Sequence, residues 1–146
     1  MKILVCVDLS DSTEAILNTI ERLCRPLNAK IWLLHNAMPE PDTIEFKVDP
    51  IDARESLAKK FHRQHRQIQA LAEQLRKLEI DATALLVHGR TVDTILTEAA
   101  DLDIDLIVVG SHGHGAMHQL LLGSISEGVL HRSSKPVLVI PTHERD

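Results

Sequence analysis

The chain has 146 residues, of which 44% are hydrophobic and 25% are charged, which predicts one soluble globular domain over residues 1–146. Its formal charge of -5 argues against a nucleic-acid partner, because phosphate backbones attract basic surfaces. With two Phe, one Trp and no Tyr, the chain also lacks the aromatic residues on which single-stranded bases stack.

No apolar run approaches membrane length, and the first, Ile3 to Val7, is too short for the core of a secretion signal. We therefore expect a cytoplasmic protein with no membrane partner. In that compartment Cys6 and Cys24 are expected to stay reduced, since the chain has no Cys-x-x-Cys pair.

Short apolar runs predict five strands, at residues 2–7, 31–36, 82–87, 106–109 and 136–140. Apolar residues spaced by three and four predict helices between them. The first helix has Ile16, Ile20, Leu23 and Leu27 on one face, and the second runs from Ile51 to Glu79 with an apolar stripe from Leu57 to Leu78. This alternation predicts an α/β fold, a doubly wound five-stranded parallel sheet with helices on both faces.

Two helix starts carry capping signals. Asp11 with Glu14 is a plausible cap for the first helix, and Ser124-x-x-Glu127 has the pattern of a capping box for the last. The long second helix also carries a basic cluster without an intervening acid, which is either a solvated face or a docking surface for an acidic partner. Its members are Lys59, Lys60, His62, Arg63, His65 and Arg66.

The segment from Leu106 to Glu127 holds the main functional signal. A strand ends at Gly110, and Gly113 and Gly115 follow closely, so the backbone there can approach a ligand. Gly123 then precedes a predicted helix start, where free N–H groups and the helix dipole attract anions. The hydroxyls of Ser124 and Ser126 add possible donors.

Two common phosphate motifs are absent. A Gly-x-x-x-x-Gly-Lys-Ser/Thr loop needs a Gly-Lys pair, and the chain has none. The glycines run Gly-x-x-Gly-x-Gly after a late strand, which differs from the dinucleotide fingerprint that opens a first βαβ unit. The spacing that is present, Gly110-x-x-Gly113, nine residues, then Gly123-Ser124, resembles the nucleotide-binding branch of the universal stress protein family.

This resemblance extends along the whole chain and implies an adenine nucleotide α-hydrolase-like, Rossmann-like three-layer fold. It implies a stress-response or signalling module that binds ATP, ADP or AMP, with Mg²⁺ accompanying the nucleotide. It also implies a homodimer through the final strand, Val137 to Ile140. The chain shows no evident nucleophile with an adjacent base and no clear carboxylate pair, so we expect no catalytic residues. A nucleotide-independent dimeric stress protein and a slow ATP-hydrolysing enzyme of the same α/β group remain the alternatives.

The resemblance also implies the site residues. Asp8 matches an acidic position near the adenine and ribose, although it could simply turn the chain into the first helix. Asn36 stands where the family often has a valine whose backbone holds the adenine. The full implied set is Asp8, Leu9, Asn36, Ala37, Val109, Gly110, His112, Gly113, His114, Gly115, Gly123, Ser124, Ile125 and Ser126.

Three histidines in and after the glycine segment suggest an alternative hypothesis, a metal-binding site. They are His112, His114 and His118, and they are also the chain's candidates for acid–base chemistry. Because an ordered zinc site needs three or four ligands in fixed geometry, and no Cys or acid joins this group, we expect no bound metal ion other than the Mg²⁺ that accompanies a nucleotide.

Overall fold

A computed structural model describes residues 1–37, 50–111 and 122–142. Strands and helices alternate along these residues as expected, and each strand lies within one residue of its predicted range. The elements are β1 (Lys2–Cys6), α1 (Ser12–Leu27), β2 (Lys30–Asn36), α2 (Pro50–Lys77), β3 (Asp81–Val87), α3 (Thr91–Asp101), β4 (Leu106–Gly110), α4 (Ser124–Arg132) and β5 (Val137–Ile140).

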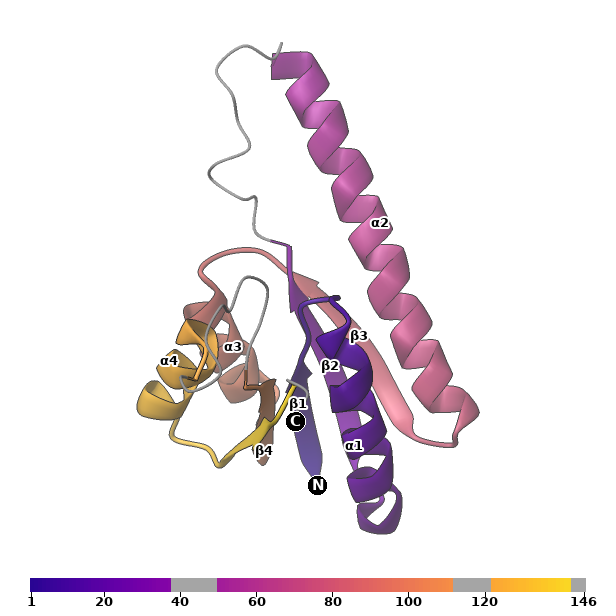
Figure 1. The fold of residues 1–146 in the computed structure, drawn as a ribbon, viewed down its shortest axis with the longest axis vertical. Coiled ribbons are helices and arrows are strands. Elements are labelled where there is room, and N and C mark those ends of the chain that lie inside the picture. Colours follow the sequence, from indigo (N-terminus) through magenta and orange to yellow (C-terminus); the bar gives the residue numbers. More distant parts are fainter. Residues whose placement is uncertain (38–49, 112–121, 143–146) are drawn as a thin grey trace, which may run out of the picture.

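The five strands form one parallel sheet in the order β3-β2-β1-β4-β5 (Figure 1). Chain order therefore reverses between β1 and β4, which pair directly, with Leu4 opposite Ile107. This is the doubly wound sheet predicted from the sequence. Ligands of such sheets bind beyond the carboxyl ends of the strands at this reversal, so the carboxyl ends of β1 and β4 frame the candidate site.

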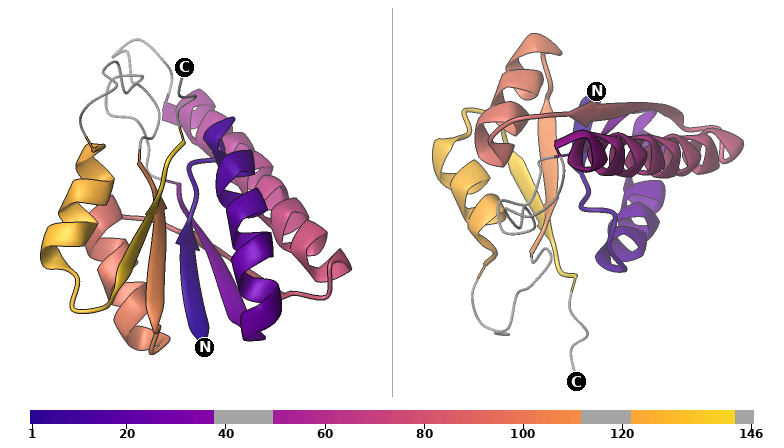
Figure 2. Two further views of the ribbon diagram at one scale, coloured as in Figure 1. Left: turned by 60° about the horizontal axis from the view of Figure 1, so that its bottom comes forward. Right: turned by 90° about the horizontal axis from the view of Figure 1, so that it is seen from above.

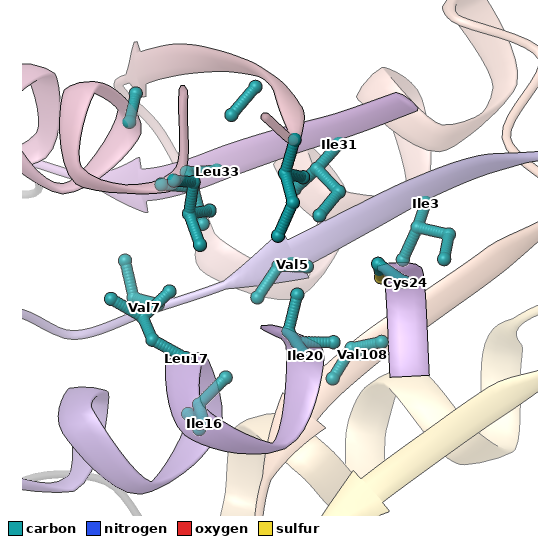
Figure 3. Packing of buried hydrophobic residues seen from close by; sticks show 14 of the residues in the cluster. Ile3, Val5, Val7, Ile16, Leu17, Ile20, Cys24, Ile31, Leu33 and Val108 are labelled. Atoms are coloured by element: carbon teal, nitrogen blue, oxygen red, sulfur yellow. The ribbon is translucent and has the colours of Figure 1, made fainter. Parts of the chain in front are cut away.

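Helices α1 and α2 cover one face of the sheet, and α3 and α4 cover the other (Figure 2). Successive strand residues point to opposite faces, so Ile3 and Val5 of β1 pack under α1 and α2 while Leu4 packs under α3 and α4. Figure 3 shows Ile16, Leu17, Ile20 and Cys24 of α1 packed against the strands. Burial on both faces explains why the strands are continuous apolar runs.

The buried face of α1 differs in part from the predicted one. Ile16 and Ile20 are buried as expected, but Leu23 and Leu27 are 42% and 47% exposed. Leu23 lies on the flank of the buried face, where Cys24 takes the next inward position, and Leu27 is the last residue of the helix. The sheet covers neither side chain.

The apolar stripe of α2 is buried only in its C-terminal half. Ile68 and Leu75 are buried, whereas Ile51 and Leu57 are 64% and 43% exposed. A 28-residue helix is about 42 Å long, but β3, with 7 residues, spans only about 23 Å. The N-terminal half of α2 therefore projects beyond the sheet (Figure 1). None of the helices described here is long and apolar enough to span a membrane.

Candidate functional site

The carboxyl end of β4 and the start of α4 are joined by hydrogen bonds. The Ser111 N–H donates to the Ile140 carbonyl of β5 (2.8 Å), and the Gly123 N–H donates to the Ser111 carbonyl (2.8 Å). The start of α4 is therefore fixed at the end of β4, beside the point where the strand order reverses. His112, Gly113, His114 and Gly115 lie between these anchors but outside the described residues.

The N-cap residue of α4 provides no side chain to cap the helix. Gly123 occupies the N-cap position with extended backbone angles, φ −61° and ψ 149°, and Ser124 is the first helical residue. The first intrahelical bond is donated by the Glu127 N–H to the Gly123 carbonyl. The predicted capping box is therefore wrong, because Ser124 lies one residue too late to cap. The three preceding N–H groups, of residues 124 to 126, make no helical bond, which suits an anion.

Ser126 holds α4 to the sheet. It is buried, and its hydroxyl donates to the Gly110 carbonyl at the end of β4. The hydroxyl we expected to face a ligand is therefore bound within the protein, and the backbone N–H of Ser126 is the group left for a ligand. Ser124 and Ile125 are exposed, whereas Val109 is a core residue buried among the side chains under α3 and α4.

Asp8 organises the turn from β1 into α1. Its Oδ1 accepts hydrogen bonds from the Ser10 N–H (3.0 Å), the Ser10 hydroxyl (2.5 Å) and the Ser12 hydroxyl (3.3 Å). Asp11 stands at the N-cap position as predicted, but its side chain makes no capping bond. Leu9 has a φ of 60°, in the left-handed region that costs a residue with a Cβ about 1–2 kcal/mol. The turn is thus a constrained polar loop at the carboxyl end of β1.

Asn36 ties the carboxyl end of β2 to the turn between β3 and α3. Its Nδ2 donates to the Gly89 carbonyl (2.7 Å) and to the Thr91 hydroxyl (2.8 Å). Asn36 follows Leu34 by two residues and therefore shares its face of the sheet, the one covered by α3 and α4. That face is also the one on which α4 begins.

Both backbone hydrogen-bonding groups of Ala37, its N–H and its carbonyl, have partners within the protein. Its N–H donates to the Val87 carbonyl (2.8 Å), and its carbonyl accepts from His88 Nδ1 (3.1 Å). The His88 ring stacks on Phe61 of α2, with ring centroids 5.0 Å apart and planes at 14°. These contacts fix the position of the chain just after β2.

The structure therefore brings Asp8, Asn36 and Gly110 to the carboxyl ends of three adjacent strands, β1, β2 and β4. Sequence reasoning missed the partners that hold Asp8 and Asn36 in place. An aspartate often accepts a hydrogen bond from the backbone N–H two residues later, so the Asp8-x-Ser10 pattern could have indicated the turn between β1 and α1. Nothing local could have paired Asn36 with Gly89, 53 residues away.

Within the described ranges, no group of His, Cys, Asp and Glu side chains is arranged to hold a metal ion. His112, His114 and His118, the candidate metal ligands from the sequence, lie outside those ranges. Both cysteines are free thiols. Burial raises the pKa of the Cys6 thiol to about 12 and raises that of Cys24, so neither is activated as a nucleophile.

Comparison with known proteins assigns the family. The model of the Universal stress protein family matches residues 1–141. The chain belongs to the universal stress protein family. A universal stress protein of Thermus aquaticus is 30% identical over 138 residues, which cover 94% of this chain and 96% of that protein. Universal stress protein MJ0577 of Methanocaldococcus jannaschii is 41% identical over a shorter stretch of 56 residues, 38% of this chain and 35% of that protein.

Solved structures of the family share this fold. The MJ0577 structure superposes with a TM-score of 0.82 at 25% identity, covering 99% of this chain and 97% of that one. A universal stress protein in complex with cAMP has a TM-score of 0.67 at 22% identity and covers 98% of both chains. One from Archaeoglobus fulgidus in complex with dAMP has a TM-score of 0.63 at 21% identity, covering 96% and 97%. These last two relatives were therefore each solved with an adenine nucleotide bound.

Proposed function

We propose that this universal stress protein belongs to the nucleotide-binding branch and binds ATP, ADP or AMP at the carboxyl ends of β1, β2 and β4. The observation that carries the proposal is the first turn of α4, where Gly123 provides no capping side chain and the N–H groups of residues 124 to 126 make no helical bond. The fold places this turn where the strand order reverses, the usual ligand position in such sheets. The complexes of related structures with cAMP and dAMP support it.

In this proposal the phosphates lie on the backbone. The N–H groups of residues 124 to 126 and the glycine segment, with His112 and His114 between its glycines, surround them. Asp8 and Leu9 border the ribose, and Asn36 and Ala37 border the base. Mg²⁺ enters with the nucleotide, because phosphate and water oxygens are the ligands it prefers and no lysine follows the glycines to neutralise the charge.

We propose binding as the function in preference to catalysis. Phosphoryl transfer needs a base or a positioned cation beside the phosphate. The one buried hydroxyl at the start of α4, that of Ser126, already donates to the Gly110 carbonyl, so it is not poised as a nucleophile. A single-turnover assay with labelled ATP should give a rate orders of magnitude below the ~1 to 100 s⁻¹ of kinases. Release at kinase-like rates would make the protein an enzyme.

We also propose that two copies pair through β5. This strand is at the edge of the sheet, bonded to β4 on one side. The carbonyls of Pro136 and Ile140 accept hydrogen bonds from the N–H groups of Ile107 in β4 and of Ser111 just after it. By alternation the N–H groups of Val137 and Val139 point away from β4. An edge with outward N–H groups and apolar side chains is a template for pairing with another strand. A second copy of β5 satisfies these groups.

Calorimetric titration with ATP and Mg²⁺ tests the binding proposal, using Gly123→Val as the informative variant. The backbone angles of Gly123 are open to any residue, so the substitution should leave far-UV circular dichroism unchanged. The new side chain should nevertheless obstruct the phosphates and abolish binding. Ser134→Val, an exposed position beyond the other end of α4, is the matched control and should bind like the parent. Equal affinity of parent and Gly123→Val would reject the α4 site.

A further inference from the structure

Three cations of the basic cluster on α2 lie on one side of the helix. An α-helix turns by about 100° per residue, so Lys59, Arg63 and Arg66 fall within an arc of about 60°. The buried Ile68 is about 180° from Lys59, on the side of the helix that packs against the sheet. The three cations are exposed. They form a cationic stripe, about 10 Å long, that faces away from the sheet.

The stripe is fixed in position by contacts on the other side of α2. Phe61 lies about 160° from Lys59 around the helix, and its ring stacks on that of His88 after β3, with ring centroids 5.0 Å apart. Ile68 is fully buried two turns later. The backbone that carries the stripe is therefore already ordered, which lowers the entropic cost of binding a partner.

The charges of the stripe are not neutralised within the described part of the chain. Glu55 precedes Lys59 by four residues, a spacing that favours an ion pair on a helix, yet no ion pair forms there. Residues 59–66 contain four cations and no acid. Other cations of the described ranges do pair with carboxylates, namely Arg25, Lys30, Arg76, Arg132 and Lys135. The stripe is therefore complementary to a negatively charged surface.

The length of the stripe and the charge of the whole chain limit what can bind it. The chain carries a formal charge of -5, so a long polyanion, such as nucleic acid or an anionic membrane, would meet net negative charge beyond the stripe. At physiological ionic strength, charges act over about 8 Å. A short acidic segment therefore gains the attraction of the stripe and avoids most of the repulsion. On a helix, carboxylates spaced by four and three residues match the spacing of the cations.

We propose that the cationic stripe of α2 docks an acidic helix of a partner protein, with its carboxylates against Lys59, Arg63 and Arg66. Helix α2 covers β2 and β3, at the edge of the sheet opposite β5, so docking is compatible with pairing through β5. It needs no nucleotide and goes beyond the proposed function. Exposed ion pairs are individually weak, so binding is reversible and depends on salt.

Titration with synthetic helical peptides tests the docking. One alanine-rich peptide carries glutamates spaced by four and three residues, and a second has the same composition with its glutamates spread around the helix. The parent should bind the first more tightly, and about 1 M salt, in which charges act over only about 3 Å, should abolish binding. Replacing the three cations of the stripe by glutamine should weaken binding about tenfold. It should leave far-UV circular dichroism unchanged, because glutamine suits a helix.

The matched control removes three exposed cations outside α2 and so has the same net charge as the stripe variant. Its substitutions are Arg22→Gln, Arg25→Gln and Arg90→Gln. The control should bind the first peptide like the parent. A further variant, in which the three cations of the stripe become glutamates, should bind only a peptide with lysines in place of its glutamates.

Equal affinity of the parent and the glutamine variant would overturn the inference, and so would an equal loss in the control, since the attraction would then come from net charge. Equal binding of the two peptides would overturn the match to a helix face. A parent that binds neither peptide, or that binds a single-stranded oligonucleotide of equal charge more tightly, would reject an acidic helix as the partner. Peptide binding that is lost in the stripe variant and kept in the control supports the inference.

Discussion

A β-carbon added at Gly128 of α4 would lie 2.9 Å from Cγ2 of Val92 in α3, closer than side chains pack. Val92 is β-branched and stiff in a helix, so its methyl group cannot easily turn away. A salt bridge from Arg132 to Asp93 (2.7 Å) holds the same two helices together beside this contact. Gly128 therefore lets α4 lie close against α3, and we predict that Gly128→Ala is coupled energetically to Val92.

Two opposing terms set the size of this effect. Alanine is more favourable than glycine inside a helix by about 0.8–1 kcal/mol. Overpacking a close contact costs about 1–3 kcal/mol. In the parent, Gly128→Ala should therefore be between neutral and about 2 kcal/mol destabilising. In a Val92→Ala background the obstructing methyl group is gone. There the same change should stabilise by up to about 1 kcal/mol.

Urea unfolding of the parent, both single variants and the double variant measures this coupling. All four are compared at one protein concentration, since dimerisation would make stability depend on concentration. Leu23→Ala, on the exposed flank of α1, is the control partner and should be additive with Gly128→Ala. A coupling between Gly128 and Val92 within about 0.5 kcal/mol of zero would refute the reasoning.

Val139→Pro removes an N–H group that points away from β4, so light scattering should show a folded monomer. Leu138→Pro removes a hydrogen bond to β4 and should unfold the protein. A parent protein that is itself monomeric would contradict the β5 dimer. Because the pKa of Cys6 is about 12, iodoacetamide should react slowly with it at pH 8 in the folded protein and rapidly in urea. The raised pKa of Cys6 also predicts that the free energy of unfolding falls as pH rises from about 9 towards 12, because the thiol of the unfolded chain ionises first. Equal rates of iodoacetamide reaction in the folded and unfolded protein would refute both predictions for Cys6. Elemental analysis of untagged protein should find no stoichiometric zinc, and one zinc per chain, lost in a His112/His114 double variant, would restore the metal hypothesis.

The sequence alone determined the order and bounds of the strands and the family. Runs such as Leu106 to Val109 are apolar at every position, a pattern that a strand tolerates only when both faces are covered. Helical periodicity between such runs indicates that helices connect the strands. Because these connections are right-handed, few sheet topologies other than a doubly wound one are possible. The glycine spacing from Gly110 to Gly123 then indicated the family, which the match over residues 1–141 confirms.

Tertiary structure decided what each polar side chain does. Ser124 and Asp11 both fit capping patterns, yet neither caps its helix, because capping depends on backbone angles that the packed chain sets. Ser126 turned out to bind the Gly110 carbonyl, 16 residues earlier in the chain. Asn36 is oriented by Gly89 and Thr91, which are more than 50 residues away. Apolar periodicity reports which face of an element is buried, but a hydrogen bond needs two groups within about 3 Å, and only the folded chain brings them there.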